Sequence, residues 1–306
     1  MFKYQELCWY GFGLKVGLLN LLKHKNALGS KKTLGKIFQP INSYTRFPEY
    51  YFFEQAVKDY QAANPNHSLS ALDVGSPKLF GLRLAYRYRL DICLTDVTRM
   101  NLDEYMTLWQ AVKNKAAGAA CFEQQDARNL AYPDGQFDVV YAMSVIEHIE
   151  GNRQDSKAIS ELWRVLKPGG QLIISVPFGP RYIEQHTTGF AYTDEAIIGG
   201  KRYFFQRIYD EAALQKRILA PLQAAEHLQI WTISRRNNFL TPLYHRIRQR
   251  LGDNINGLFG FLNPLLSLLL NCHHRGILTN FLVSYNSMHG LKDIYADIVL
   301  ACQKPK

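Results

Sequence analysis

The stretch Ala71-Leu72-Asp73-Val74-Gly75-Ser76-Pro77 predicts a buried strand that turns directly into a helix. Its first four residues are apolar apart from one acid, which suits a strand inside a parallel sheet. Ser76 is a favourable helix N-cap, and Pro77 suits the first helical position. Because Gly75 has no side chain, a ligand can approach the backbone there and meet the N–H groups of the helix N-terminus. The stretch therefore predicts a ligand site at a strand-to-helix turn.

Strands and helices alternate along the chain after this turn. The further predicted strands are residues 92–94, 119–122, 137–143, 172–176, 228–234 and 295–302. The predicted helices are residues 79–86, 103–117, 159–166 and 210–220. Residues 178–209 are rich in glycine and aromatic residues and are predicted to form a loop. This order indicates an α/β fold with a mostly parallel sheet between two layers of helices.

Acidic residues follow the first three predicted strands. Asp73 and Asp96 lie at the ends of the first and second strands, and Asp126-Ala127 comes shortly after the third. The carboxyl ends of parallel strands share one edge of the sheet, where open α/β sheets bind their ligands. An acid at the end of the second strand typically holds the ribose hydroxyls of a nucleotide. The three acids predict a nucleotide-like ligand at this edge.

These segments resemble those of the class I S-adenosylmethionine-dependent methyltransferases, in the type-11-like branch. The resemblance covers about residues 70–178 and includes Phe137 to Ile149 (FDVVYAMSVIEHI) and Arg164 to Gly170 (RVLKPGG). It implies a Rossmann-like three-layer sandwich with a seven-stranded, mostly parallel sheet whose last strand is antiparallel. It also implies S-adenosyl-L-methionine as cofactor, with Asp96 on the ribose and Asp126-Ala127 beside the adenine. The other implied cofactor contacts are Asp73, Gly75, Ser76 and Ser144.

The turn departs from the family pattern after its first glycine. Ser76-Pro77-Lys78 stands where the family usually has further glycines. A catalytically degenerate module that still binds the cofactor is therefore one alternative to an active enzyme. A nicotinamide-dependent oxidoreductase is another, although the second glycine of G-x-G-x-x-G is missing.

The catalytic and acceptor residues are predicted from their positions along the chain. Methyl transfer depends on alignment and on the exclusion of water, and a base is needed only for a protonated nucleophile. His148, after the fourth strand, is the predicted base, and the alternative is a histidine that satisfies hydrogen bonds at a helix end. His186, Arg207 and Tyr209 are predicted to contact an anionic or sugar-like acceptor. The alternative for Arg207 and Tyr209 is an aromatic-lined hinge.

The positive charge is concentrated at the two ends of the chain. Residues 1–47 carry a net charge of +7, residues 48–200 carry −5 and residues 201–306 carry +8. The apolar runs Trp9–Leu22 and Leu258–Leu270 are too short to span a bilayer. Each suits either a core helix or a helix in the membrane interface. We therefore expect a small or lipid- or sugar-linked acceptor and a cytoplasmic protein that contacts an anionic membrane. An RNA methyltransferase, with the basic ends on phosphate, is the alternative.

Domain organisation and metal binding are also predicted from the sequence. Residues 1–66 are expected to form a basic helical extension and residues 67–306 the methyltransferase domain. Within that domain, residues 181–227 would cover the substrate, and residues 238–292 would be an insertion before the last strand. The five cysteines are scattered without a C-x-x-C motif, which argues against a disulfide framework or a zinc cluster.

Overall fold

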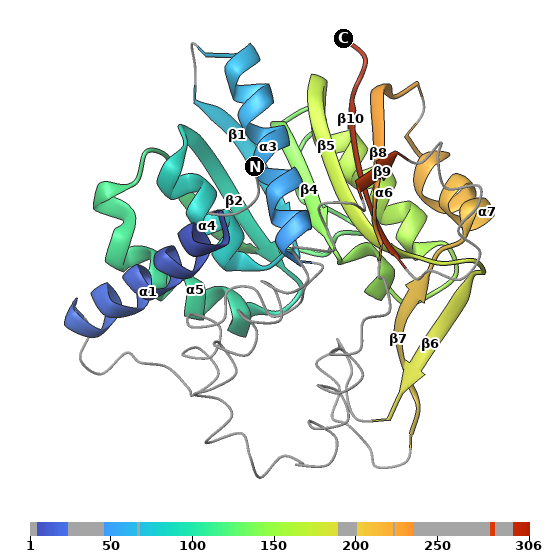
Figure 1. The fold of residues 1–306 in the computed structure, drawn as a ribbon, viewed down its shortest axis with the longest axis horizontal. Helices are drawn as coiled ribbons and strands as arrows, with labels where there is room; N and C mark the ends of the chain where they lie inside the picture. Colours follow the sequence, from blue (N-terminus) through green and yellow to red (C-terminus); the bar gives the residue numbers. More distant parts are fainter. Residues whose placement is uncertain are drawn as a thin grey trace.

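A computed structural model describes residues 5–23, 46–65, 68–188, 201–222, 224–234, 282–284 and 296–306. Its centre is a twisted sheet with the strand order β3-β2-β1-β4-β5-β10-β8-β9 (Figure 1). The first five strands are β1 (Leu69–Val74), β2 (Leu90–Asp96), β3 (Ala120–Gln124), β4 (Phe137–Met143) and β5 (Leu166–Phe178). All neighbours among these five pair in parallel, as their apolar sequences predict.

The last strand of the chain runs antiparallel to its neighbours. Strand β10 (Ala296–Gln303) lies between β5 and β8 (Glu226–Ser234) and pairs antiparallel with both. The predicted seven-stranded sheet with an antiparallel last strand is therefore confirmed. A short eighth strand, β9 (Leu282–Ser284), pairs with β8. It comes from the predicted insertion at 238–292, whose other residues lie outside the described part of the chain.

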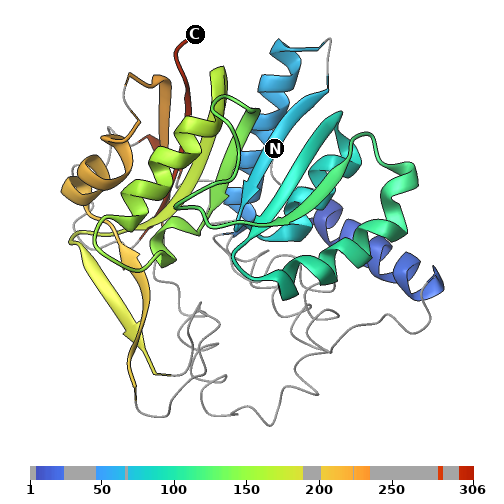
Figure 2. The same ribbon diagram turned by 180° about the vertical axis from the view of Figure 1, so that it is seen from behind.

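Helices cover both faces of the sheet, which confirms the Rossmann-like three-layer sandwich (Figures 1 and 2). One face is covered by α1 (Gln5–Lys23), α3 (Arg46–Ala63), α4 (Lys78–Arg87) and α5 (Arg99–Val112), with η1 (Lys113–Lys115) following α5. The other is covered by α6 (Gln154–Val165), α7 (Glu211–Ala213) and the π-helical turn η3 (Leu214–Leu219). None of the helices in the described ranges is long and apolar enough to cross a membrane.

The N-terminal helices share the core of the sheet's first face. The Trp9 ring stacks on Phe80 of α4, with a centroid distance of 5.2 Å and an interplanar angle of 15°. Arg83 of α4 lies over the Trp9 ring, 3.9 Å from its centroid, and forms a buried ion pair with Glu54 of α3 at 2.8 Å. The extension is therefore held to the sheet by both aromatic packing and a buried charge pair.

The predicted loop at residues 178–209 is wrong in part, because it contains two paired strands. Strands β6 (Ile183–Thr187) and β7 (Tyr203–Ile208) form an antiparallel pair that extends away from the sheet at the lower right of Figure 1. The run Tyr203-Phe204-Phe205 has the high strand propensity of aromatic residues. The glycine content that suggested a loop is concentrated in residues 189–200, which lie outside the described residues.

Candidate functional site

The turn after β1 packs tightly against the segment that follows β4. Gly75 has a φ of +65°, and a Cβ atom at this position would lie 2.7 Å from Cγ1 of Val145. Its N–H donates to the carbonyl oxygen of Thr95 at the end of β2, at 3.0 Å. Glycine is therefore required here both by the left-handed backbone and by the neighbouring side chain. The turn joins the carboxyl ends of β1, β2 and β4, where the ligand site was predicted.

Ser76 does not cap the following helix, so the N-cap prediction is wrong. Helix α4 begins at Lys78, Pro77 takes the N-cap position, and no side chain caps the helix. The Oγ atom of buried Ser76 instead accepts a hydrogen bond from the N–H of Met143 at 2.9 Å. Ser76 thus ties the β1 turn to the end of β4, and its contact with a cofactor stays a prediction.

Lys78, which departs from the family pattern, folds back beneath the turn. Its Nζ atom donates to Oδ1 of Asp73 at 2.7 Å and to the carbonyl oxygen of Ser76 at 2.8 Å. The Lys78 and Asp73 side chains are only 2% and 0% exposed. Burial raises the pKa of Asp73, and the Lys78 ammonium partly offsets this effect. The lysine therefore stabilises the turn from the core side, and the predicted cofactor contact of Asp73 stays untested.

Asp96 lies at the end of β2 with one carboxylate oxygen available. Its Oδ1 atom accepts hydrogen bonds from the backbone N–H of Thr98 at 3.0 Å and from its hydroxyl at 3.1 Å. Within the described ranges, Oδ2 has no hydrogen-bond donor. The side chain is half-buried, so a ligand at the edge of the sheet can reach it. A fixed, accessible carboxylate at this position fits the ribose hydroxyls of the implied cofactor.

Asp126 is close to Asp96 along the same edge but is paired. The backbone N–H of Gln125 donates to the carbonyl oxygen of Asp96 at 3.0 Å, which brings the two segments together. Arg128 donates from Nε to Oδ1 of Asp126 at 2.9 Å and from Nη2 to Oδ2 at 2.6 Å. This pairing lowers the pKa of Asp126. Ala127 packs against the core beside it, and the adenine contacts of both residues stay predictions.

Ser144 receives a partner that the sequence did not indicate. It has a φ of +48°, an uncommon conformation for a residue other than glycine. Its hydroxyl donates to Oε1 of Glu49, at the start of α3, at 2.8 Å. Glu49 is fully buried, so the N-terminal extension contributes an acid to the edge where the cofactor was predicted. The only sequence signal was an acid in the first turn of a helix.

His148 is held in one tautomer by the β6-β7 hairpin. It lies in the short helix η2 (Ile146–His148), and its Nδ1 atom is 2.7 Å from the carbonyl oxygen of Phe205 in β7. Because a carbonyl can only accept, Nδ1 carries the proton, and neutral His148 has its lone pair on Nε2. Nε2 lies 3.7 Å from Oε1 of Glu147. Nε2 is therefore the ring nitrogen that can accept a proton.

Arg207 and Tyr209 are buried, and their hydrogen bonds hold the hairpin to the domain. Arg207 is 1% exposed and donates to the carbonyl oxygens of Ile149 and Gly151. The Tyr209 hydroxyl donates to Asp155 at 3.0 Å. Both side chains are buried and hydrogen-bonded within the domain. Their predicted acceptor contacts stay predictions, and these bonds favour the hinge alternative.

His186 lies apart from the other predicted site residues. It is exposed on β6, where its ring meets Phe204 edge-on with a centroid distance of 5.9 Å. The structure therefore brings together Gly75, Ser76, Asp96, Asp126 and Ser144 at the sheet edge, with His148 anchored to the hairpin. It places His186 on the outer part of that hairpin.

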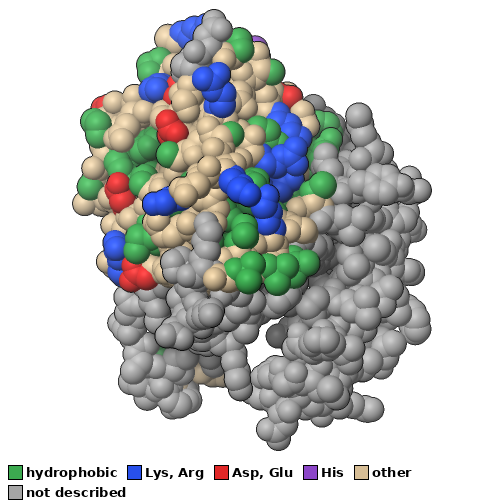
Figure 3. Space-filling model, turned by 90° about the vertical axis from the view of Figure 1, so that its left-hand side faces the viewer, with side chains coloured by type: hydrophobic (Ala, Val, Ile, Leu, Met, Phe, Trp, Pro, Cys, Tyr) green, Lys and Arg blue, Asp and Glu red, His purple; other side chains and the backbone are tan. Residues whose placement is uncertain are grey.

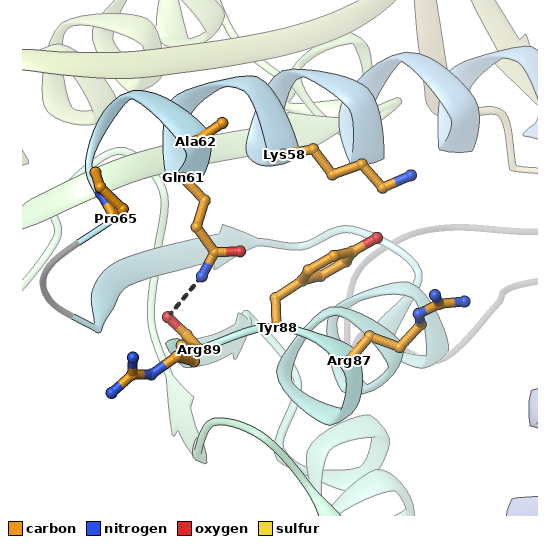
Figure 4. A pocket seen from close by; sticks show the side chains of 7 residues that line it. All are labelled: Lys58, Gln61, Ala62, Pro65, Arg87, Tyr88 and Arg89. Carbon is orange, nitrogen blue, oxygen red and sulfur yellow. Dashed lines mark hydrogen bonds between the residues drawn. The ribbon is translucent and has the colours of Figure 1, made fainter.

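A pocket at the other end of the strands is separate from this site. It is formed where α3 ends and where β1 and β2 begin (Figure 4). Gln61 crosses it and donates to the carbonyl oxygen of Arg89 at 3.4 Å. Its lining residues are Lys58, Gln61, Ala62, Pro65, Arg87, Tyr88 and Arg89. Ligands of open α/β sheets bind at the carboxyl ends of the strands, so this pocket is not the predicted cofactor site.

A family model described as a methyltransferase domain matches residues 72–174. This segment therefore belongs to a methyltransferase domain. The matched part of this methyltransferase domain runs from β1 into β5 and includes every predicted cofactor contact.

Similar proteins match the chain over short stretches. The chain is 34% identical over 84 residues to phosphoethanolamine N-methyltransferase 1 of Arabidopsis thaliana, covering 26% of this chain and 16% of that protein. It is 35% identical over 83 residues to probable tRNA methyltransferase 9B of Bos taurus, covering 27% of this chain and 17% of that protein. The chain thus spans less than a fifth of either relative.

A solved structure with a similar fold is phosphoethanolamine N-methyltransferase 2 of Haemonchus contortus, in complex with S-adenosyl-L-methionine. Its TM-score is 0.45 at 16% identity, and the alignment covers 82% of this chain and 52% of that chain.

Proposed function

We propose that this protein transfers a methyl group from S-adenosyl-L-methionine to a small or lipid- or sugar-linked acceptor. The observation that carries the proposal is Asp96, fixed through Oδ1 at the end of β2 and accessible through Oδ2. It stands beside the turn at Gly75, inside the segment that matches the methyltransferase family. When bound, the cofactor supplies an electrophilic methyl group on a sulfonium.

The chain's own residues would bind and orient the cofactor and deprotonate the acceptor. Asp96 accepts hydrogen bonds from the ribose, and the packed turn fixes its distance from Gly75. For a hydroxyl acceptor, Nε2 of His148 takes the proton, while the Phe205 carbonyl keeps Nδ1 protonated. Arg207 acts as a positioning residue, because it bonds β7 to the backbone at Ile149 and Gly151, directly after His148.

The outer face of α1 supports contact with a membrane. Leu14, Leu18 and Leu22 are 45%, 50% and 76% exposed. Their spacing of four residues places them on one side of the helix. Figure 3 shows this side of the molecule, where exposed hydrophobic side chains lie among lysines and arginines. The sequence of residues 1–47 also carries a net charge of +7, and a basic segment with an apolar face suits the surface of an anionic membrane. A membrane location favours a lipid-linked acceptor.

RNA is the second candidate acceptor. The basic ends of the chain suit phosphate, and one relative is named as a probable tRNA methyltransferase. The exposed leucines of α1 favour the membrane, because binding to a phosphate backbone relies on charge and does not need an apolar stripe.

Methyl transfer into fractionated cell material tests the proposal. The full chain is incubated with radiolabelled S-adenosyl-L-methionine and separate lipid, glycan and RNA fractions. We expect label in the lipid or glycan fraction and at least a tenfold loss with Asp96→Ala. Asp103→Ala is the matched control, because Asp103 is an exposed acid paired with Arg99 on α5. Label in RNA alone would favour the second candidate. Cofactor binding without label in any fraction would favour the degenerate module.

A further inference from the structure

Two cysteines far apart in the sequence face each other on neighbouring strands. Cys93 of β2 and Cys121 of β3 are direct partners in the parallel register. Directly paired residues project to the same face of a sheet, and so do residues two apart on one strand. Glu123, two residues after Cys121, therefore joins the same face. The two Sγ atoms and a Glu123 carboxylate oxygen all lie within 4.8 Å of one another.

The surroundings of this Cys93-Cys121-Glu123 cluster orient its members. The Tyr132 hydroxyl donates to Oε2 of Glu123 at 2.8 Å and lies 3.3 Å from Sγ of Cys93. Cys93 is buried, Glu123 is half-buried and Cys121 is exposed. The cluster thus opens to solvent on one side. Tyr132 fixes the Glu123 carboxylate, as the hydrogen-bond partners of metal ligands commonly do.

We propose that Cys93, Cys121 and Glu123 bind one zinc ion, with a water molecule as the fourth ligand. Two sulfur ligands select zinc over magnesium or calcium, which prefer oxygen alone. Bonds of ~2.3 Å from zinc to sulfur put the two sulfurs of a tetrahedral site roughly 3.8 Å apart. Since the present separations are at most 4.8 Å, a shift of about 1 Å or less closes the site.

Metals bind the thiolate form of cysteine, so zinc binding displaces the protons of both thiols into solvent.

Zinc at this site would clamp the edge strand β3 to β2. Strand β3 leads within two residues to Asp126, so the clamp would stiffen the segment beside the predicted adenine contact. The inference goes beyond the proposed methyl transfer and does not depend on it. The spacing of the cysteines along the sequence argues against a zinc cluster. It does so because Cys93 and Cys121 are brought together only by the register of β2 and β3.

Cobalt(II) spectroscopy and zinc calorimetry on the full, reduced chain test the proposal. We expect one zinc ion per chain, and with cobalt a thiolate-to-metal charge-transfer band and the visible bands of a tetrahedral site. Cys121→Ser should weaken zinc binding at least tenfold and remove most of the charge-transfer band. Glu123→Gln should weaken binding and leave that band in place. Circular dichroism and thermal unfolding without metal check that each variant folds.

Two cysteine variants serve as controls. Cys8→Ser removes an exposed cysteine on α1, and Cys272→Ser removes the cysteine beside His273 and His274. Both should bind zinc as the wild type does. Absence of the charge-transfer band in the reduced wild type would overturn the proposal. So would zinc binding that survives Cys121→Ser and is lost in Cys272→Ser.

Discussion

The Nζ atom of Lys78 lies 2.7 Å from Oδ1 of Asp73, and both side chains are buried beneath the turn at Gly75. This pair explains how the turn forms without the additional glycines of the family pattern. The lysine also donates to the carbonyl oxygen of Ser76. This hydrogen bond fixes the backbone of the turn, which additional glycines would leave more flexible.

Removal of the Lys78 charge should destabilise the protein strongly at neutral pH. Lys78→Met leaves the Asp73 carboxylate buried without a countercharge, at a cost of about 3–5 kcal/mol. Burial already raises the pKa of Asp73, so folding takes up a proton between the unfolded and folded pKa values. Stability is lost as the pH rises through that window, and the variant's deficit should shrink as the pH falls from neutral toward it. Denaturant unfolding at neutral and at acidic pH measures this deficit. A deficit that is equal at both would contradict this interpretation.

His148 should act in proton transfer and not in cofactor binding. His148→Gln should reduce methyl transfer to a hydroxyl acceptor by roughly 10²–10⁴-fold. The affinity for S-adenosyl-L-methionine should stay within twofold of the wild type. A His148→Gln variant that keeps the wild-type rate would return His148 to the helix-end alternative.

Arg207 and His186 should differ sharply in their effect on stability. Arg207→Met removes the donors to the carbonyls of Ile149 and Gly151, and should cost about 3 kcal/mol or more. His186→Ala, on the exposed face of β6, should change stability by less than about 0.5 kcal/mol. Thermal or denaturant unfolding measures both. A stable Arg207→Met protein that has lost only acceptor affinity would restore the predicted acceptor contact.

Membrane contact should depend on the exposed leucines of α1. A variant with serine at Leu14, Leu18 and Leu22 should fail to sediment with anionic vesicles, whereas the wild type sediments and is released by high salt. Serine at the exposed residues Val97 and Leu228 is the matched control. Substitution is preferable to deletion of the helix, because deletion would also remove Trp9 from the core. Equal sedimentation of both variants would refute this surface.

The sheet could be predicted from the sequence because its strands are continuous apolar runs. Phe137 to Met143 is buried at every position, and such a run has few alternatives in an α/β protein. The position of Asp96 followed from the same pattern, since an acid that ends a parallel strand must lie at the carboxyl edge. The direction of the last strand came from the family resemblance and not from its residues.

The remaining features depend on contacts between distant segments. Glu49 reaches Ser144 only because α3 packs across the sheet, and Cys93 meets Cys121 only through strand register. Serine is a favoured N-cap residue, yet the hydroxyl oxygen of Ser76 accepts a hydrogen bond from the N–H of Met143 instead. The sequence predicts a loop where the β6-β7 hairpin lies, because the nearby glycines are typical of loops. The aromatic run at Tyr203 forms a strand only by pairing with β6, and that pairing is not a local property.

Calorimetric titration of S-adenosyl-L-methionine into the full chain tests the central claim most directly. Wild type and Asp103→Ala should bind alike, while Asp96→Ala should bind at least tenfold more weakly, because hydrogen bonds to a charged group contribute ~1.5–3 kcal/mol each. Asp96→Asn keeps the acceptor for Thr98 but loses the charge, so its affinity should lie between the two. Equal affinity of wild type and Asp96→Ala, or no binding by the wild type, would contradict the assignment.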